Sequence, residues 1–289
     1  MTFVRGVVLA LPFIVGPAAV VYGLRTNSLL SLSDCPLLET LAAEKRGREL
    51  LAQRSAVSKK LRRIEVAGDM QHWLTPHGEF WVPSASVDRL GFVISEQVSD
   101  IYGAVSLVRV GDTVIDCGAD IGTFVRTALN RGAAKVIAVE PAPWKEPCLR
   151  RTFAREIESG KVVVYPKGVW NEDSKLKLDG DTLSDKGVEV PLTTIDHIVQ
   201  ELSLDRVDVI KMDIEGAERR ALNGARLTIQ RFKPRLTIAT EHLADDYVAV
   251  PRLIQNVDPG YTVECGICVG QFGRLQPYTM YFLPKPGGS

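Results

Sequence analysis

The chain has 289 residues, of which 45% are hydrophobic, and it carries 35 Lys and Arg against 35 Asp and Glu. This length suits one sizeable α/β domain with an appendage rather than two full domains. The formal net charge of zero argues against nucleic acid as a partner, because binding to phosphates usually needs a strongly basic face.

The first element is an apolar run over residues 7–24, which holds no charged side chain and lies between Arg5 and Arg25. At about 1.5 Å per residue such a run would span roughly 27 Å as a helix, enough to cross the core of a bilayer. We predict a single-pass membrane anchor over residues 1–25, and hence the membrane as a partner. A cleaved signal peptide is the alternative, although Val21-Tyr22-Gly23 offers only a weak cleavage context.

The next segment, residues 37–66, mixes apolar and basic side chains in a pattern that predicts an amphipathic helix. We place it in a stalk over residues 26–70, ahead of a globular domain over residues 71–289. The basic end of the stalk would lie either on anionic lipid or in water, and both alternatives stay open. Residues 72–83 predict a hairpin, and a helix is expected from Asp88 to Tyr102.

Strand and helix patterns then alternate, which predicts a doubly wound, mostly parallel sheet of the Rossmann-like α/β class. The seven expected strands cover residues 112–117, 135–140, 161–165, 207–212, 235–241, 261–265 and 278–283. The expected helices cover residues 123–131, 145–158, 194–202, 216–231 and 247–257. The polar segment 171–190, with Asp179-Gly180 turn chemistry, predicts a surface hairpin inserted after the third strand.

The junction at residues 110–122 combines a buried-strand pattern, a glycine-rich turn and the start of a helix. Such a junction points backbone N–H groups at a ligand. Ligands of open α/β sheets lie at the carboxyl ends of the strands, so Asp116 to Gly122 and Glu140 are expected at one site. Glu140 ends the second strand, 18 positions after Gly122, where a carboxylate would bind a ribose diol.

The spacing Asp116-x-Gly118-x-x-x-Gly122 differs from the Gly-x-Gly-x-x-Gly pattern of dinucleotide sites, and Asp120 adds a second acid. Two carboxylates would repel a pyrophosphate and attract a ligand that carries an ammonium and a sulfonium. The predicted cofactor is therefore S-adenosylmethionine rather than NAD. No Gly-Lys-Ser/Thr sequence follows the turn, which excludes a phosphate-binding loop.

These motifs resemble the FkbM-type methyltransferases, a branch of the class I S-adenosylmethionine-dependent fold, over roughly residues 80–283. The resemblance lies in the stretches Gly111 to Gly122, Val139 to Pro141, Leu192 to Asp196 and Ile210 to Glu218. It implies a seven-stranded sheet that ends in an antiparallel hairpin, and O-methylation, often of a sugar or natural-product hydroxyl. The chain departs from the family in having Asp120 where Asn is usual, and in a shorter 171–190 loop. The residues predicted to bind the cofactor are Asp116, Gly118, Ala119, Asp120, Gly122, Thr123, Glu140, Pro141 and Asp213.

The predicted catalytic residues are Asp213, Glu241 and His242. The resemblance places Asp213 near the methionine moiety or the acceptor, while an N-cap for the helix at 216–231 is the alternative. Glu241 and His242 end the fifth strand, and a neutral imidazole could take a hydroxyl proton. A divalent ion that bridges Asp213 and the acceptor stays open, but the sequence shows no full set of ligands and no metal is predicted.

The function expected from these features is S-adenosylmethionine-dependent O-methylation of a sugar, glycolipid or other small molecule, through in-line attack of the acceptor oxygen on the methyl group. Two alternatives remain: an NAD-type oxidoreductase, and a membrane-tethered module that binds the nucleoside without catalysis. Since the cofactor is cytosolic, the catalytic domain is expected on the cytoplasmic side of the membrane.

Overall fold

The computed structural model of the chain describes residues 49–180, 182–183, 185–271 and 274–285. The predicted membrane anchor and the first part of the predicted stalk lie outside these residues. Within the described part, no helix combines the length and apolar character that crossing a membrane would require.

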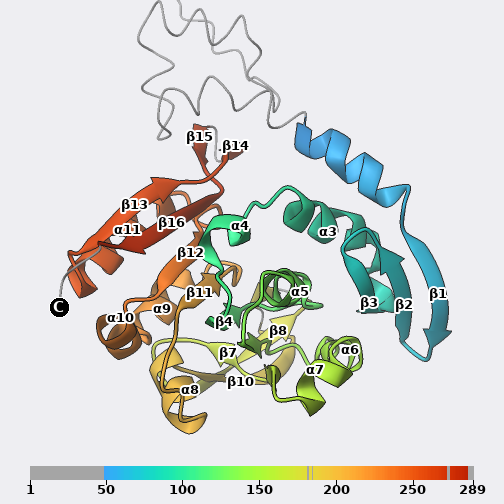
Figure 1. Cartoon of the computed structure of the whole chain (residues 1–289), viewed down its shortest axis with the longest axis horizontal. Helices are drawn as coiled ribbons and strands as arrows, with labels where there is room; N and C mark the ends of the chain where they lie inside the picture. The colour runs from blue at the N-terminus through green and yellow to red at the C-terminus, as the bar shows by residue number, and fades with distance from the viewer. Residues whose placement is uncertain (1–48, 181, 184, 272–273, 286–289) are drawn as a thin grey trace, which may run out of the picture.

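A seven-stranded sheet forms the centre of the molecule, in the order β13-β16-β12-β11-β4-β5-β6 (Figure 1). The strands are β4 (Thr113–Cys117), β5 (Lys135–Val139), β6 (Val162–Tyr165), β11 (Val209–Met212), β12 (Arg235–Ala239), β13 (Tyr261–Cys265) and β16 (Thr279–Pro284). All neighbouring pairs are parallel except those of β16, which runs antiparallel to both β12 and β13. The prediction of a seven-stranded, mostly parallel sheet with an antiparallel end is confirmed.

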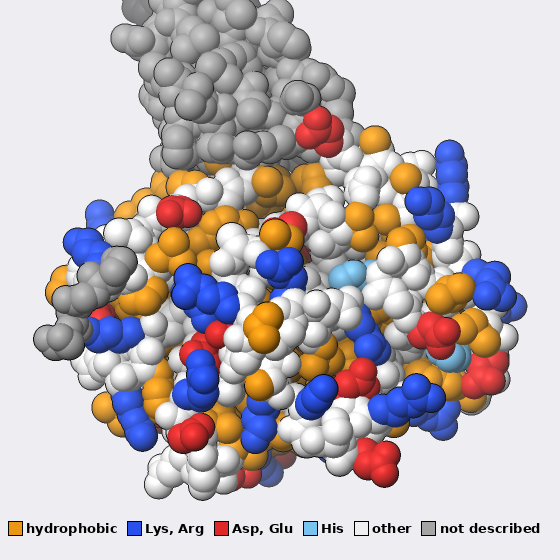
Figure 2. All heavy atoms as spheres, viewed as in Figure 1, with side chains coloured by type: hydrophobic (Ala, Val, Ile, Leu, Met, Phe, Trp, Pro, Cys, Tyr) orange, Lys and Arg blue, Asp and Glu red, His pale blue; other side chains and the backbone are white. Residues whose placement is uncertain are grey.

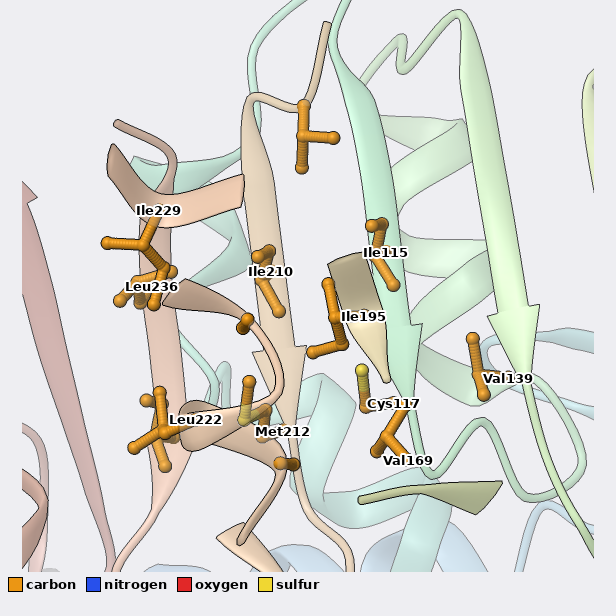
Figure 3. Close-up of a cluster of buried hydrophobic side chains, with 14 of the residues drawn as sticks. Ile115, Cys117, Val139, Val169, Ile195, Ile210, Met212, Leu222, Ile229 and Leu236 are labelled. Carbon is orange, nitrogen blue, oxygen red and sulfur yellow. The ribbon is translucent and has the colours of Figure 1, made fainter. Parts of the chain in front are cut away.

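The sheet is covered on both faces, which explains why its central strands are continuous runs of apolar residues. Neighbouring residues point to opposite faces, so Ile115 joins one buried cluster and Val114 the other. Figure 3 shows the Ile115 side of the sheet, where Ile210 and Leu236 from the next strands pack with Ile195 and Ile229 from helices. The helices on this side are α8 (Ile195–Glu201), α9 (Glu218–Asn223), α10 (Arg226–Phe232) and α11 (Asp246–Val257).

The opposite face packs against α3 (Leu90–Val98), α5 (Thr123–Asn130) and α6 (Glu146–Thr152). The helix expected at 145–158 is two helices, since α7 (Ala154–Glu158) begins after a break at Phe153, whose ring is fully buried. The helix expected at 216–231 is also broken, between α9 and α10. At Gly224, between the two helices, an added Cβ atom would lie 2.1 Å from the carbonyl oxygen of Trp170, so the backbone at the break passes close to another segment of the chain.

The N-terminal part of the described chain is helical at residues 49–58 and then forms a three-stranded antiparallel sheet. Its strands are β1 (Arg62–Ala67), β2 (Met70–Thr75) and β3 (Gly78–Pro83). The hairpin expected at 72–83 is confirmed by the pairing of β2 with β3. The prediction of a helix at 37–66 is wrong over residues 62–66, because this segment forms β1 and pairs with β2. The sheet packs on α6 through Trp81, whose backbone N–H donates to Thr152 Oγ1 at 2.9 Å.

The helix expected from Asp88 to Tyr102 is shorter. The chain passes through the 3-10 helix η2 (Ser84–Arg89) into α3, which ends at Val98, and then makes the short helix α4 (Ala104–Leu107). Asp100, two residues after α3, has a φ of +49°, and this left-handed residue ends the helix before Tyr102.

A second small sheet lies on the carboxyl-end side of β4 and β5, in the order β7-β10-β8-β9. Its strands are β7 (Gly168–Val169), β8 (Ser174–Asp179), β9 (Thr182–Leu183) and β10 (Val188–Thr193). The hairpin expected at 171–190 is confirmed by the antiparallel pairing of β8 with β10. It also has an apolar side, where Leu178, Val190 and Leu192 are buried, so the hairpin is not solely a surface feature.

A last hairpin, β14 (Cys268–Gln271) with β15 (Arg274–Pro277), precedes β16. Basic and acidic side chains are interspersed over the face of the molecule seen in Figure 2, as expected for a chain with no formal net charge.

Candidate functional site

A cavity of about 400 Å³ opens where β4, β5, β11 and β12 end at their carboxyl termini. Its walls include the residues that follow each of these strands, together with α3 and the apolar side of the small sheet around Trp170 and Leu192. This volume is within the range of pockets that hold small molecules. The sheet therefore brings segments that are far apart in the sequence to one site.

Glu140, directly after β5, has both carboxylate oxygens held by backbone N–H groups. Oε2 accepts from Asp120 N at 2.8 Å, and Oε1 accepts from Ala142 N at 3.0 Å. Burial raises the pKa of Glu140, although Lys145 opposes this effect. Each oxygen keeps a second lone pair, so a ligand with two neighbouring hydroxyls could donate to the same carboxylate.

Asp120 in the glycine-rich loop pairs with a cation that the sequence pattern does not reveal. Its Oδ1 lies 2.8 Å from Lys145 Nζ, and only 7% of the lysine side chain is exposed. Burial alone would raise the pKa of Asp120, but Lys145 outweighs this effect and the pKa is lowered. Asp120 is therefore an ionised carboxylate that a neighbouring positive charge neutralises.

Asp116 is fully buried behind the loop and pairs with Lys211 from β11. Lys211 Nζ lies 3.1 Å from Asp116 Oδ1 and donates to the carbonyl oxygen of Gly118 at 2.8 Å. Burial raises the pKa of Asp116 to about 6 despite the lysine, and Asp116 in turn raises the pKa of Lys211 against the effect of burial. Both groups are charged at neutral pH, and the lysine ties the loop after β4 to β11.

Gly118 is required where the loops after β4 and β11 meet. Its φ is +78°, and an added Cβ would lie 2.0 Å from the backbone oxygen of Asp213. A side chain at this position would therefore push apart the loops that carry Asp120 and Asp213.

His242 lies among three carboxylates. Its Nδ1 is 3.0 Å from Glu218 Oε1, and its Nε2 is 3.4 Å from Asp213 Oδ1 and 3.6 Å from Glu215 Oε2. Burial would lower the pKa of His242, but these carboxylates raise it to about 9. His242 is therefore an imidazolium at neutral pH, and Asp213 is held from its other oxygen by the Tyr102 hydroxyl, which donates to Oδ2 at 2.5 Å.

Two further carboxyl groups of the cavity have pKa values close to neutral. Burial raises the pKa of Glu96 in α3 to about 8 and that of Glu241 after β12 to about 7, and the negative charge of Asp213 adds to both shifts. The Tyr278 hydroxyl donates to Glu96 Oε1 at 2.6 Å. At pH 7 Glu96 is mostly protonated, whereas Glu241 is divided between its two forms.

Sequence comparison identifies the domain that contains this cavity. The family model described as the methyltransferase FkbM domain matches residues 116–259, from the last part of β4 to beyond α11. Residues 116–259 belong to the FkbM methyltransferase family. No curated protein matches the sequence.

Among solved structures, the chain resembles a methyltransferase FkbM from Methylobacillus flagellatus at 19% identity and a TM-score of 0.48. The match covers 84% of this chain and 61% of that one, so the chain spans less than two thirds of that relative. A putative RNA methyltransferase from Pyrococcus horikoshii is 19% identical, with a TM-score of 0.40, and 83% and 98% of the two chains are covered. A putative methyltransferase from Streptococcus mutans, in complex with SAH, is 13% identical, with a TM-score of 0.42. The match covers 66% of this chain and 97% of that one.

Most of the site residues predicted from the sequence line the cavity of the FkbM domain. They are Gly118, Ala119, Asp120, Thr123, Glu140, Pro141, Asp213, Glu241 and His242. Two predicted cofactor residues do not line it. Asp116 is buried beneath the loop with Lys211, and Gly122 packs against Phe153, whose ring would lie 2.2 Å from an added Cβ. In the structure Asp116 and Gly122 therefore lie behind the loop and do not line the cavity.

The structure also corrects two chemical predictions. Asp116 and Asp120 were expected to attract a cationic cofactor, but Lys211 and Lys145 neutralise them. His242 was expected to be a neutral base, but the surrounding carboxylates keep it protonated. Negative charge at the cavity of the FkbM domain comes instead from carboxylates after β5, β11 and β12.

Several residues of the site were missed in the sequence. Lys211 left a signal, since a lysine inside a strand that is otherwise apolar needs a buried partner. Glu96, Tyr102 and Tyr278 left none, because their contacts join distant parts of the sequence. Tyr102 lies 111 residues from its partner Asp213, and Glu96 lies 182 residues from its partner Tyr278.

Proposed function

We propose that the domain transfers the methyl group of S-adenosylmethionine to a hydroxyl of a sugar, glycolipid or other small molecule. Glu140 carries this proposal. Its carboxylate is fixed by the N–H groups of Asp120 and Ala142 and retains acceptor capacity for a ribose diol. It lies beside the glycine-rich loop, in a domain of a methyltransferase family.

The rest of the cavity supports the same ligand. Pro141, Val169 and Leu192 provide apolar surface that suits an adenine ring. Asp213 and Glu241 provide negative charge for the ammonium and sulfonium groups. The Asp120–Lys145 pair leaves little net charge at the loop itself, so the cationic part of the ligand is expected toward Asp213.

S-adenosylmethionine supplies an activated methyl group, which the acceptor oxygen attacks as the carbon–sulfur bond breaks. The residues of the cavity align the two reactants and exclude water. Glu241, partly ionised at neutral pH, accepts the proton that the hydroxyl loses. As long as no other cation is bound among these carboxylates, His242 is protonated and balances the charge of Asp213 and Glu218.

Calorimetric titration of the full chain with S-adenosylmethionine tests the proposal. We expect saturable binding that weakens at least tenfold in Glu140→Ala, because the variant loses the hydrogen bonds to the ribose. Glu189→Ala is the matched control, since Glu189 lies on β10 and pairs with Lys175 on the surface. A correctly folded protein that does not bind the cofactor contradicts the proposal.

The same preparation separates the two alternatives. Binding of NAD without binding of S-adenosylmethionine would indicate an oxidoreductase. Binding of S-adenosylmethionine without methyl transfer to a panel of sugars and glycolipids would indicate a module that holds the nucleoside and does not catalyse.

We also propose that residues 7–24 anchor the chain in a membrane, with the domain on the cytoplasmic side where the cofactor is made. Protease added to intact spheroplasts should then leave the domain uncut. Cleavage of the domain before the cells are opened would contradict this orientation.

A further inference from the structure

Asp213 and His242 line the cavity, and together with the buried Glu218 they form a group whose joint role the proposed methyl transfer does not explain. Asp213 follows β11, Glu218 begins α9 and His242 follows β12, and one ligand atom from each lies within 4.8 Å of the other two. Among the described residues no other group of three His, Cys, Asp or Glu side chains meets this condition. The sequence did not reveal the set, because tertiary structure brings the three residues together.

Glu218 is the most buried member of the group, and one of its carboxylate oxygens lacks a partner. Only 1% of the residue is exposed, and its Oε1 accepts a hydrogen bond from Ile214 N at 2.9 Å. Its Oε2 is buried and accepts no hydrogen bond. A buried carboxylate oxygen without a partner is costly, and a bound cation would relieve that cost.

We propose that Asp213, Glu218 and His242 bind one divalent transition-metal ion of the Mn²⁺ or Zn²⁺ type. Ligand atoms about 2.1 Å from one ion lie roughly 3 to 4 Å apart, so the group can close on an ion with small movements of its side chains. Two carboxylates with one imidazole suit such an ion better than Ca²⁺ or Mg²⁺, which take oxygen ligands.

The surroundings fit the coordination of an ion. Asp213 is oriented by the Tyr102 hydroxyl, which occupies Oδ2 and leaves Oδ1 toward His242. Such an outer hydrogen bond is the usual way in which a ligating carboxylate is fixed. Binding through an imidazole nitrogen displaces the proton that the carboxylates otherwise hold on His242, as metal ligation by histidine does in general.

The ion would lie at the wall of the cavity that also holds Glu241, and could there bind oxygen atoms of the acceptor and orient them. This role rests on the proposed methyl transfer, but the presence of the site does not. Metal binding and cofactor binding are therefore measured separately.

For the test, the full chain is first freed of metal by dialysis against a chelator. It is then titrated with Mn²⁺, and electron paramagnetic resonance measures the Mn²⁺ that stays free. We expect one Mn²⁺ per chain, displaced by Zn²⁺. Asp213→Asn, Glu218→Gln and His242→Gln should each weaken binding at least tenfold. Glu201→Gln is the matched control, since Glu201 is a surface carboxylate that pairs with Tyr165 and Lys167 away from the cavity.

Circular dichroism establishes whether each variant is folded. If Glu218→Gln does not fold, the result for His242→Gln decides the test. Absence of saturable Mn²⁺ binding, or binding that all folded variants retain, overturns the proposal. In that case the positive charge that offsets Asp213 and Glu218 would be the imidazolium of His242. If S-adenosylmethionine fails to bind while Mn²⁺ binds, the metal site stands and the proposed function falls.

Discussion

Lys211 brings a positive charge into the interior of the domain, where only 4% of the residue is exposed. Its partner Asp116 is fully buried, and neither oxygen of that carboxylate accepts a well-oriented hydrogen bond. The stability of each charge therefore depends on the other. Asp116 contributes to the site by holding the loop in place through Lys211 and Gly118, rather than by contact with a ligand.

Replacement of Asp116 by Ala is expected to lower the free energy of unfolding by about 3–5 kcal/mol, because Lys211 is left buried without a counter-charge. Denaturant titration measures the change. The double variant Asp116→Leu/Lys211→Met removes both charges and should recover most of the loss. An Asp116→Ala protein as stable as wild type would contradict the buried ion pair.

At the scale of elements, the break between α9 and α10 is stabilised from another part of the chain. Asp196 in α8 accepts hydrogen bonds from the backbone N–H groups of Leu227 and Thr228, at 3.0 and 2.7 Å. These are N–H groups of the first turn of α10, which have no partner within the helix. The long-range cap explains why one helix was expected where two exist.

Removal of this cap by Asp196→Ala is expected to cost about 1 kcal/mol of unfolding free energy, in the usual range for a lost N-cap. Asp205→Ala, at an exposed loop position, is the control and should change stability little. Equal effects of the two substitutions in a thermal melt would show that the contact from α8 does not stabilise α10.

At the scale of the whole molecule, segments from near both ends of the described chain close the cavity. Glu96 in α3 meets Tyr278, which lies 182 residues later, directly before β16. Tyr102 meets Asp213 in the same region. The site is therefore complete only when the N-terminal helices and the C-terminal strands have both packed on the sheet.

The buried carboxyl group of Glu96 is expected to make the stability of the whole protein depend on pH. Its pKa rises from 4.5 in the unfolded chain to about 8 in the folded one, so the folded state retains a proton that the unfolded state releases. The free energy of unfolding should fall as the pH rises through this window, by up to about 1.4 kcal/mol for each pH unit.

Glu96→Gln keeps the shape of the protonated group and should flatten this part of the curve, as measured by denaturant titration at several pH values. Glu264→Gln, on an exposed position of β13, should leave the wild-type slope. A Glu96→Gln protein whose stability changes with pH as steeply as the wild type would rule out Glu96 as the source.

The sequence by itself determined the seven strands of the central sheet, the hairpin at 72–83 and the residues that follow β4, β5, β11 and β12. Each of these depends on local periodicity, or on the rule that the carboxyl ends of parallel strands share one edge. The FkbM resemblance drawn from those motifs is confirmed over residues 116–259.

Only the tertiary structure decided the chemistry of the site. The charges of Asp116, Asp120 and His242 depend on Lys211, Lys145 and Glu218, and no local pattern encodes which side chains meet across strands and helices. The pKa of a group follows from its burial and its neighbours, and both are properties of the packed chain. For the same reason the Asp213, Glu218 and His242 group became visible only in the folded protein.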